Sequence, residues 1–293
     1  MKSLIVLISN PAAKGTTDNK IKAACHILEA GGYEVEHIST GQRGDAEVFA
    51  REAVKKSPSM IIAAGGDGTI NEVINGIAGS EIPLAFVPLG TVNVLAKELA
   101  VPENVEGAIK KALHGTPRIV SLGKIVIAHP SSAGRYFILM AGIGYDGETV
   151  FGINETLKKY WGMGAYFYSG IKTLLRFNPS ELVFDIDGQR FSGYSAIIGK
   201  AAKYGGHFKV TPDARIADPV LDVCIFKGRT RPDILRYVAG IVTKRHLTFR
   251  DVEYLKAESI EVKGRAHIQI DGDYMGMTPA RVEVKKNALR LIY

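Results

Sequence analysis

The chain has 293 residues, of which 46% are hydrophobic and 23% charged, and this composition excludes a disordered chain. Its net charge is +7. No apolar run approaches the roughly 18 residues of a membrane span, and the apolar start is too short for a signal peptide. We therefore expect a cytoplasmic protein. Cys25 and Cys224 lie far apart in the sequence, and we expect two buried thiols, neither a disulfide nor a zinc site.

The first part of the chain alternates strand and helix patterns, which is typical of a parallel sheet. Strands are predicted at 3–9, 33–39, 59–64 and 83–88, and helices near 18–30, 44–56, 69–78 and 92–99. The loops "NPAAKG", "GGDGT" and "LGTVN" follow the first, third and fourth strands. In a parallel sheet these loops meet at one edge, where open α/β sheets bind their ligands. Each loop precedes a helix, whose N-terminus favours an anion.

The loop "GGDGT", residues 65–69, combines several features of a phosphate site. A glycine pair lets backbone N–H groups approach a polyphosphate closely, and Thr69 offers a hydroxyl. Asp67 can hold a Mg²⁺ ion, or a water molecule bound to it. The chain has no Walker-type "GxxxxGK[ST]" motif. On its own, the same stretch is equally consistent with a tight turn.

Beyond about residue 118 the pattern changes to short alternating runs such as "RYFILMAGIG" and "VLDVCIFKG". These runs predict an antiparallel second domain, a β-sandwich, with helical stretches near 152–176 and 232–245. The domain boundary is expected between residues 115 and 130.

A basic segment lies between residues 227 and 250, which contain seven basic residues and one acidic residue, Asp233. The basic residues are Lys227, Arg229, Arg231, Arg236, Lys244, Arg245 and Arg250. The middle, "PDILRYVAGIV", has the apolar spacing of a helix with one buried face. Such a segment could rest on anionic lipid or on nucleic acid. The more common alternative is a core helix with solvated basic flanks.

The strings "GGDGTINEVINGI" and "PLGTVNVLAKEL" resemble the diacylglycerol kinase catalytic domain family, which includes bacterial soluble lipid kinases and sphingosine kinases. Further motifs of that family follow in order along the chain: "NPAAKG", "TGQRGDA", "AGIGYDGETV", "YGGHFKVTPDARIADPVLDV" and "IDGDYM". The resemblance implies an open α/β nucleotide-binding domain joined to an antiparallel β-sandwich, with the last strand returning to the first domain. The implied domains are 1–122 together with 285–293, and 123–284.

The resemblance also implies an ATP site. Its residues would be Asn10, Thr40, Gly65, Gly66, Asp67, Gly68, Thr69, Ile70, Asn71, Thr91 and Asn93. The place of Thr40 rests on the resemblance alone, because nothing in its local sequence marks it for chemistry.

The resemblance places the catalytic base at Asp273, which closes the "IDGD" stretch, with Asp67 acting beside Mg-ATP. The family has Glu where this chain has Asp273. The side chain is one methylene shorter, so its carboxylate lies about 1.5 Å closer to the backbone. Either the site closes further or Asp271 shares the role. "IDGD" is also a strong hairpin signal, like "IDGQ" at residues 186–189.

The resemblance further implies a structural Mg²⁺ ion held by the Asp218 side chain and the backbone carbonyls of Arg215 and Val220. The family's Asp-Asp-Gly reads Ala217-Asp218-Pro219 here. The change removes one possible oxygen ligand and restricts the backbone, so an ordinary polar turn is the equal alternative.

"AGIGYDGE" matches the dinucleotide pattern GxGxxG, but no βαβ unit surrounds it, so we expect no dinucleotide there. The resemblance places Asp146, within this stretch, beside the substrate.

The expected function is an ATP-dependent lipid kinase that transfers the γ-phosphate of Mg-ATP to a lipid hydroxyl. Diacylglycerol, phosphatidylglycerol, a sphingoid base and an undecaprenyl-type alcohol all fit. Its partners would be the lipid alcohol and, transiently, a membrane surface. A nucleic-acid partner is not expected, because the basic segment lacks interleaved aromatic residues, and a homodimer is left open. The alternatives are a non-catalytic nucleotide or lipid sensor and, less favoured, NAD kinase, whose later Thr-Pro-Thr-Gly-Ser-type motif is missing here.

Overall fold

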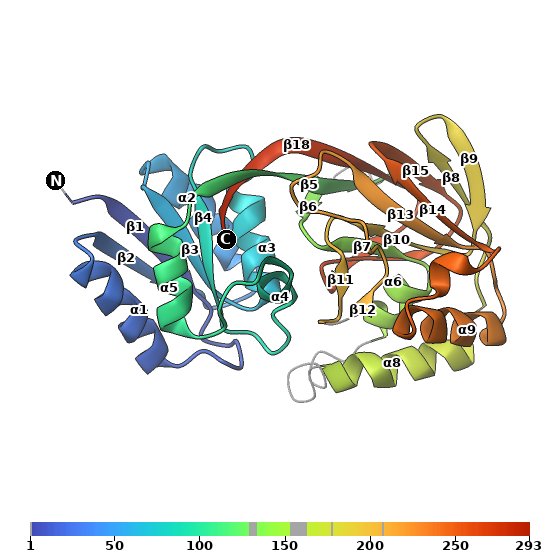
Figure 1. Cartoon of the computed structure of the whole chain (residues 1–293), viewed down its shortest axis with the longest axis horizontal. Helices are drawn as coiled ribbons and strands as arrows, with labels where there is room; N and C mark the ends of the chain where they lie inside the picture. The colour runs from blue at the N-terminus through green and yellow to red at the C-terminus, as the bar shows by residue number, and fades with distance from the viewer. Residues whose placement is uncertain (1, 129–133, 153–162, 177, 207) are drawn as a thin grey trace. The chain divides into compact units, whose positions relative to one another are not determined.

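The computed structural model describes residues 2–128, 134–152, 163–176, 178–206 and 208–293 (Figure 1). The chain divides into two compact units. The first comprises Met1–Ser121 and Asn287–Tyr293, and the second comprises Leu122–Lys286. Among the described residues, no helix combines the length and the apolar character needed to cross a membrane.

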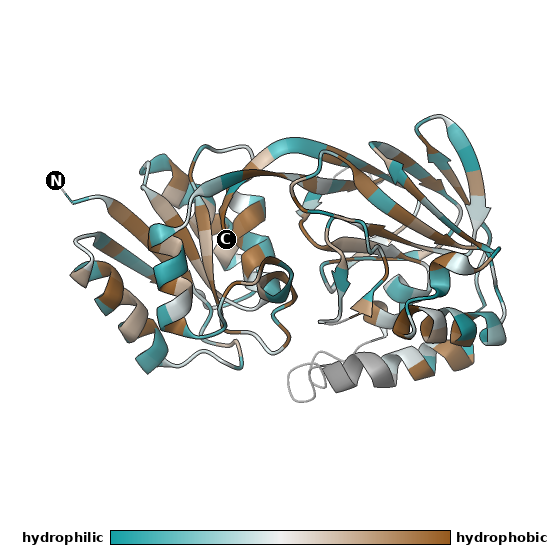
Figure 2. Ribbon diagram, in the orientation of Figure 1, coloured by the Kyte–Doolittle hydropathy of each residue, from teal (hydrophilic) through white to brown (hydrophobic). Residues whose placement is uncertain are grey.

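The first unit contains a parallel sheet in the order β2-β1-β3-β4. Its strands are β1 (Leu4–Ser9), β2 (Glu34–Ser39), β3 (Met60–Gly65) and β4 (Leu84–Pro88). Nearly every residue of β1, β3 and β4 is buried, as expected of parallel strands covered on both faces, and these strands are strongly apolar in Figure 2. The end of β18 (Ala280–Ile292) adds a fifth parallel strand, with Leu291 paired to Leu84.

Helices cover this sheet: α1 packs with α5, and α2 packs with α3. Their bounds are α1 Asp18–Ala30, α2 Asp45–Lys55, α3 Asp67–Ile77, α4 Val94–Leu99 and α5 Val105–His114. Helix α4 begins two residues later than predicted because Asn93 adopts a left-handed conformation, with φ of 52°. Helix α3 begins two residues earlier, at the aspartate of the glycine-rich loop.

The described residues of the second unit form two large sheets and one small two-stranded sheet. One is a six-stranded antiparallel sheet in the order β14-β13-β10-β7-β16-β17, and the other contains β15, β8, β9, β5, β6 and the first part of β18. The strands are β5 Pro117–Ile127, β6 Arg135–Phe137, β7 Met140–Ile143, β8 Leu182–Ile186, β9 Gln189–Gly193, β10 Ser195–Gly199, β13 Leu221–Phe226, β14 Val252–Ala257, β15 Ser259–Lys263, β16 His267–Ile270 and β17 Asp273–Met277, with a small hairpin of β11 Lys203–Tyr204 and β12 Phe208–Lys209. One apolar core, including Phe184, Ile198 and Ile268, draws on both sheets. The predicted fold class, a parallel α/β domain plus an antiparallel sandwich whose last strand returns, is confirmed.

The described residues of the second unit include the helices α6 (Tyr145–Phe151), α8 (Met163–Arg176) and α9 (Arg231–Val242), with a short 3₁₀ turn at His246–Thr248. Helix α6 packs on β16 and on α8. The prediction of a helix starting near residue 152 was wrong at that end, because Gly144, with φ of 86°, turns the chain out of β7 and starts α6. Residues 153–162 of the predicted helix lie outside the described residues.

The two cysteines lie in different units. Cys224 is buried, and burial raises the pKa of its thiol to about 12. Cys25 is only partly buried, so the expectation of two buried thiols was wrong for this residue.

Candidate functional site

The loops after β1, β3 and β4 are joined by backbone hydrogen bonds at the carboxyl edge of the parallel sheet. The amide of Asn10 donates to the carbonyl of Ala64 at 2.9 Å, and that of Gly15 donates to Leu89 at 2.9 Å. The amide of Leu89 donates to the carbonyl of Gly65 at 2.8 Å. Three segments far apart in the sequence therefore form one continuous backbone surface.

Glycine is required where two of these loops touch. A Cβ on Gly90 would lie 2.6 Å from the Cα of Gly66, and a Cβ on Gly65 would lie 2.7 Å from the hydroxyl of Thr69. Real side chains do not tolerate such distances, so the loops can approach each other only as bare backbone. This geometry leaves the first N–H groups of α3 close to a second backbone loop.

The Asp67 carboxylate binds the start of helix α4. Its two oxygens accept hydrogen bonds from the amides of Val94 and Leu95, each at 3.0 Å. Asn93, the residue before α4, gives that helix no side-chain cap, so Asp67 supplies the cap from another segment. Burial raises the pKa of Asp67, and the two backbone hydrogen bonds oppose that rise.

The predicted asparagines organise the same loops. Asn10 donates through Nδ2 to the hydroxyl of Thr69 at 3.0 Å and accepts from the amide of Ala12 at 2.9 Å. Asn93 accepts from the amide of Gly90 at 2.8 Å and donates to Glu103 at 3.1 Å. Both side chains therefore hold the loops in place.

The remaining predicted ATP residues lie along the same edge. Thr40 is buried directly after β2, and its amide donates to the carbonyl of Ser9 at 2.8 Å. Thr91 is exposed in the loop after β4. Ile70 and Asn71 are buried in α3, and the amide of Ile70 donates to Gly66 within the helix at 3.1 Å. The structure thus brings the predicted set to one edge of the sheet, but Ile70 contributes to the core.

A cavity of about 430 Å³ lies beside this edge. It is lined by Ser9, Pro11 and Ser39, sequence neighbours of Asn10 and Thr40, and by α1 side chains including Cys25 and Lys22. It includes none of the glycine-rich loop. A hydrogen bond of 2.8 Å between the Ser9 hydroxyl and Nε2 of His37 forms part of its wall.

In the second unit, Asp271 and Gly272 form the turn between β16 and β17, with φ of 48° and 85°. The Asp271 carboxylate accepts the amides of Ile138, Leu139 and Met140 at 2.9, 3.0 and 2.9 Å. The Asp271 carboxylate is therefore occupied by hydrogen bonds to the turn between β6 and β7. For this reason Asp271 is poorly placed to act as a base. Asp273, the first residue of β17, is half-buried and remains the candidate.

In the other Asp-Gly turn, the aspartate carboxylate also accepts backbone amides from a neighbouring segment. Asp187 and Gly188 have φ of 48° and 86°, and the Asp187 carboxylate accepts the amides of Glu258 and Ser259 at 3.0 and 2.9 Å. Both sequences are therefore hairpins, as the Asp-Gly signal indicates. The second acid after the turn, Asp273, is what distinguishes the β16–β17 hairpin.

Asp146 is buried and connected to this hairpin. Its carboxylate accepts from Gln269 Nε2 at 2.6 Å and from the Tyr204 hydroxyl, while the amide of Gly272 donates to Gln269 at 2.8 Å. Burial raises the pKa of Asp146. The sequence reasoning missed Gln269 and Tyr204. A polar residue inside the apolar run "HIQI" was the available signal for Gln269.

The GxGxxG stretch has a structural explanation. A side chain on Gly142 would collide with the Asp146 carboxylate, and one on Gly147 would collide with the backbone of His267. Strand β7 pairs antiparallel with both β10 and β16, so the stretch belongs to no βαβ unit.

The predicted structural metal site contains a lysine. Lys200 is 0% exposed, and its ammonium donates to the carbonyls of Arg215 and Asp218 at 2.8 and 2.6 Å, with a longer contact of 3.4 Å to Val220. The backbone carbonyls of Arg215, Asp218 and Val220 do converge on one point. The Lys200 ammonium group occupies that point, where the resemblance implied a Mg²⁺ ion. Among the described residues, no group of three or more His, Cys, Asp or Glu is arranged to hold a metal ion.

Comparison with known proteins agrees with this architecture. The model of the diacylglycerol kinase catalytic domain matches residues 4–125, and that of the "YegS C-terminal NAD kinase beta sandwich-like domain" matches residues 140–293. A diacylglycerol kinase of Bacillus subtilis is 32% identical over 259 residues, covering 86% of this chain and 83% of the relative. One from Staphylococcus aureus is 30% identical over 287 residues, covering 96% and 89%.

A crystal structure from Bacillus anthracis, of a protein assigned as a diacylglycerol kinase, superimposes with a TM-score of 0.82. It is 25% identical and covers 99% of this chain and 95% of its own. The resemblance drawn from the motifs, and the class of enzyme it implied, are confirmed. The chain belongs to the diacylglycerol kinase family of lipid kinases.

Proposed function

We propose that this protein transfers the γ-phosphoryl group of Mg-ATP to the hydroxyl group of a lipid. The observation that carries the proposal is the bare backbone surface at the start of α3, where Gly66 and Gly90 touch and Asp67 fixes the neighbouring helix. Backbone N–H groups there can donate hydrogen bonds to phosphate oxygens, because no side chain stands in the way. The cavity beside Ser9 and Ser39 is our candidate for the rest of the nucleotide.

The donor set at Asp67 is compatible with Mg²⁺. A carboxylate has about four lone-pair sites, and the two backbone hydrogen bonds use two of them. A bound Mg²⁺ ion would neutralise phosphate charge at this position. The protein's own contribution would be to hold the loops rigidly and to exclude water from the phosphates.

We assign the role of general base to Asp273. Phosphoryl transfer to an alcohol needs a group that accepts the hydroxyl proton. Asp271 is held by three backbone amides, whereas Asp273 starts the next strand. The hydrogen-bonded series from Asp146 through Gln269 to Gly272 would keep the turn that carries Asp273 in one conformation.

The relatives named as diacylglycerol kinases favour diacylglycerol as the acceptor, with phosphatidylglycerol and a sphingoid base as the alternatives. The experiment is transfer of label from γ-labelled ATP to each lipid in mixed micelles with Mg²⁺. We expect one labelled lipid with the wild type and none with Asp273→Asn. Asp185→Asn, which changes an acid of the other Asp-Gly hairpin, is the matched control and should retain activity. Binding of ATP without any labelled lipid would instead favour a non-catalytic sensor.

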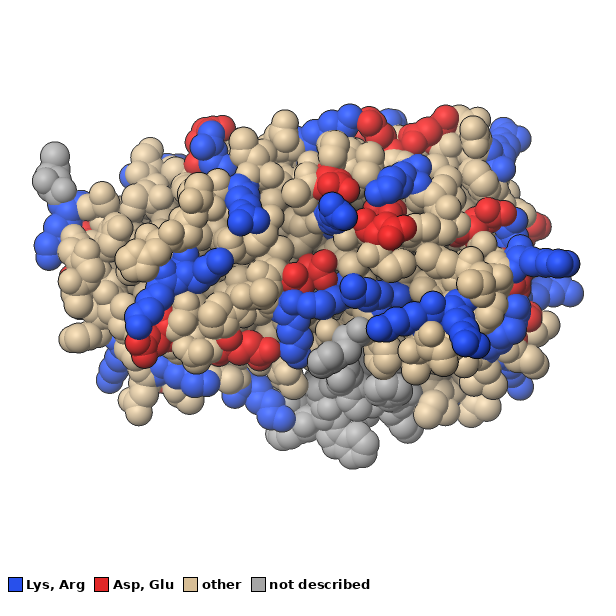
Figure 3. Space-filling view, viewed as in Figure 1, with Lys and Arg blue, Asp and Glu red and all other residues tan. Residues whose placement is uncertain are grey.

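We also propose that the second unit docks on the membrane that holds the substrate. Helix α9 buries Ile234 and Tyr237 but exposes Leu235, Val238 and Val242. Helix α8 packs against α9 and exposes Ile171 and Leu175, each 61% exposed. Exposed apolar side chains beside basic ones are typical of a surface that enters the lipid headgroup region. Figure 3 shows Lys and Arg side chains along the face that carries α9.

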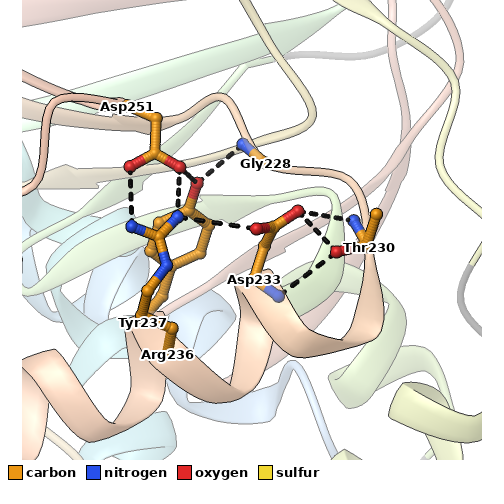
Figure 4. Close-up of polar contacts among 6 residues, drawn as sticks. All are labelled: Gly228, Thr230, Asp233, Arg236, Tyr237 and Asp251. Carbon is orange, nitrogen blue, oxygen red and sulfur yellow. Dashed lines mark hydrogen bonds and ion pairs between the residues drawn. The ribbon is translucent and has the colours of Figure 1, made fainter.

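Several basic residues of this segment have structural partners. Lys227 forms an ion pair with Glu253 at 2.6 Å. Arg236 forms a two-point ion pair with Asp251, whose carboxylate also accepts the Tyr237 hydroxyl, and it contacts Asp233 at 3.5 Å (Figure 4). Arg231 donates to the carbonyl of Leu175 at 2.5 Å. Arg229, Lys244 and Arg245 are exposed and are better candidates for lipid contact.

Sedimentation with vesicles tests the docking surface. Leu235→Asp combined with Val238→Asp should reduce binding to anionic vesicles, because both changes place charge on the apolar face. Val183→Asp, at an exposed apolar residue of β8 in the same unit, is the matched control and should bind like the wild type. Equal binding by the wild type and the double variant would contradict this surface.

A further inference from the structure

A buried ammonium group lies at the point where the family resemblance places a divalent cation. Lys200 follows β10, and its Nζ donates to the carbonyls of Arg215 and Asp218 in the turn that precedes β13. Strands β10 and β13 are neighbours, with Gly199 paired to Asp222. The ammonium therefore ties the end of one strand to the turn that leads into the next.

The distances are those of hydrogen bonds, and the ammonium occupies the point on which the three carbonyls converge. Contacts of 2.8 and 2.6 Å are normal for an ammonium group and a carbonyl oxygen. A Mg²⁺ ion requires oxygen atoms at about 2.0–2.1 Å in octahedral geometry, and it would have to displace the lysine. Ala217 offers no side-chain oxygen, and Pro219 stands where the family has the flexible glycine.

The local charge is balanced without a metal. Lys256 lies 3.6 Å from the Asp222 carboxylate and 4.0 Å from that of Asp218. Asp222 is buried and also accepts the Tyr254 hydroxyl at 2.8 Å. Lys200 also interacts electrostatically with both aspartates, so two lysines lie near two carboxylates. A divalent cation added here would leave two excess positive charges partly out of water, which is unfavourable.

We propose that Lys200 replaces the structural divalent cation of this fold and supplies the cross-link between β10 and the turn at residues 215–220. The second unit then holds its shape without a bound metal. Any requirement of the protein for Mg²⁺ would come from the nucleotide alone. This inference concerns stability and is independent of the catalytic proposal.

Thermal unfolding and metal content test the inference on the intact chain. The wild type should unfold at the same Tm in EDTA and in Mg²⁺, and mass spectrometry under non-denaturing conditions should find no retained divalent cation. Lys200→Met keeps the apolar stem but leaves the carbonyls unpaired, so Tm should fall by roughly 5 °C or more. Lys209→Met, at an exposed lysine of the same unit, should leave Tm nearly unchanged.

Two results would overturn the inference. One is a wild type that retains about one divalent cation per chain and loses thermal stability in EDTA. The other is a Lys200→Met protein that unfolds at the same Tm as Lys209→Met. If Lys200→Met does not fold at all, the chelation and mass measurements on the wild type still decide the matter.

Discussion

The carboxylate of Asp67 accepts a hydrogen bond of 3.0 Å from the amide of Leu95, and so the first residue of α3 caps the start of α4. The glycine-rich loop and the loop after β4 are thereby held as one piece. The aspartate would have this structural role whether or not it also contacts Mg²⁺.

Asp67→Asn should therefore weaken the fold as well as the nucleotide site. An amide can accept only one of the two backbone hydrogen bonds and presents a donor to the other, at a cost of about 1–3 kcal/mol. Urea unfolding and ATP binding measure the two effects. Glu106→Gln, an exposed first-turn acid of α5, is the control. A fully stable Asp67→Asn protein would show that the cap contributes little.

Gly90→Ala should separate the two glycine-rich loops. The added Cβ would lie 2.6 Å from the Cα of Gly66, so the backbone must shift. We expect a loss of about 1–3 kcal/mol in the free energy of unfolding and at least a tenfold loss of ATP affinity. The control is Gly170→Ala, where the nearest atom would be 3.6 Å away. Unchanged ATP affinity would mean that the contact between these loops does not shape the site.

Asp146→Asn should change how stability depends on pH. Burial raises the pKa of Asp146 above its ordinary value of 3.8. As the pH rises past that value, the unfolded chain loses this proton before the folded one does, so this group lowers stability with rising pH. The Asn variant lacks the effect. Its stability relative to the wild type should rise as the pH increases above about 4, by at most about 1.4 kcal/mol per pH unit.

Urea unfolding at several pH values measures this difference. Glu148→Gln, a neighbouring acid on α6, is a useful comparison because burial also raises its pKa although it is less enclosed than Asp146. Parallel curves for Asp146→Asn and the wild type would contradict the prediction.

Arg236→Ala should affect stability more than lipid binding. Arg236 is paired with Asp251, but its side chain is 42% exposed and solvent screens the pair, so the loss should not exceed about 1 kcal/mol. Binding to anionic vesicles should change less than with Arg229→Ala combined with Lys244→Ala. If Arg236→Ala alone reduced vesicle binding as much as that double change, the charge would act on lipid directly.

The parallel sheet was predictable because its strands are continuous apolar runs between helices with regular apolar spacing. Helix α6 was not, because the signal is a single left-handed glycine, Gly144, after a strand. The cap that Asp67 gives to α4 was equally inaccessible, since it joins segments 28 positions apart.

The residues of the site could be predicted where this chain keeps the motifs of the family. They could not be predicted where this chain carries a different residue. The convergence of Arg215, Asp218 and Val220 followed from the family resemblance, but Lys200 precedes them by 15 to 20 positions. A lysine between "AIIG" and "AA" was a visible anomaly, because lysine is seldom fully buried without partners. Nothing in the sequence of the basic segment indicates that Arg236 pairs with Asp251, which lies 15 positions further along the chain.

Strand β18 has a consequence for the order in which the protein can fold during synthesis. Its early residues pair with β15, with Ser259 opposite Glu283, and its end pairs with β4 through Leu291 and Leu84. Strands β1 to β4 leave the ribosome long before β18, the fifth strand of the parallel sheet, is synthesised. The N-terminal sheet must therefore wait, with the edge of β4 open, until almost the whole chain has been translated.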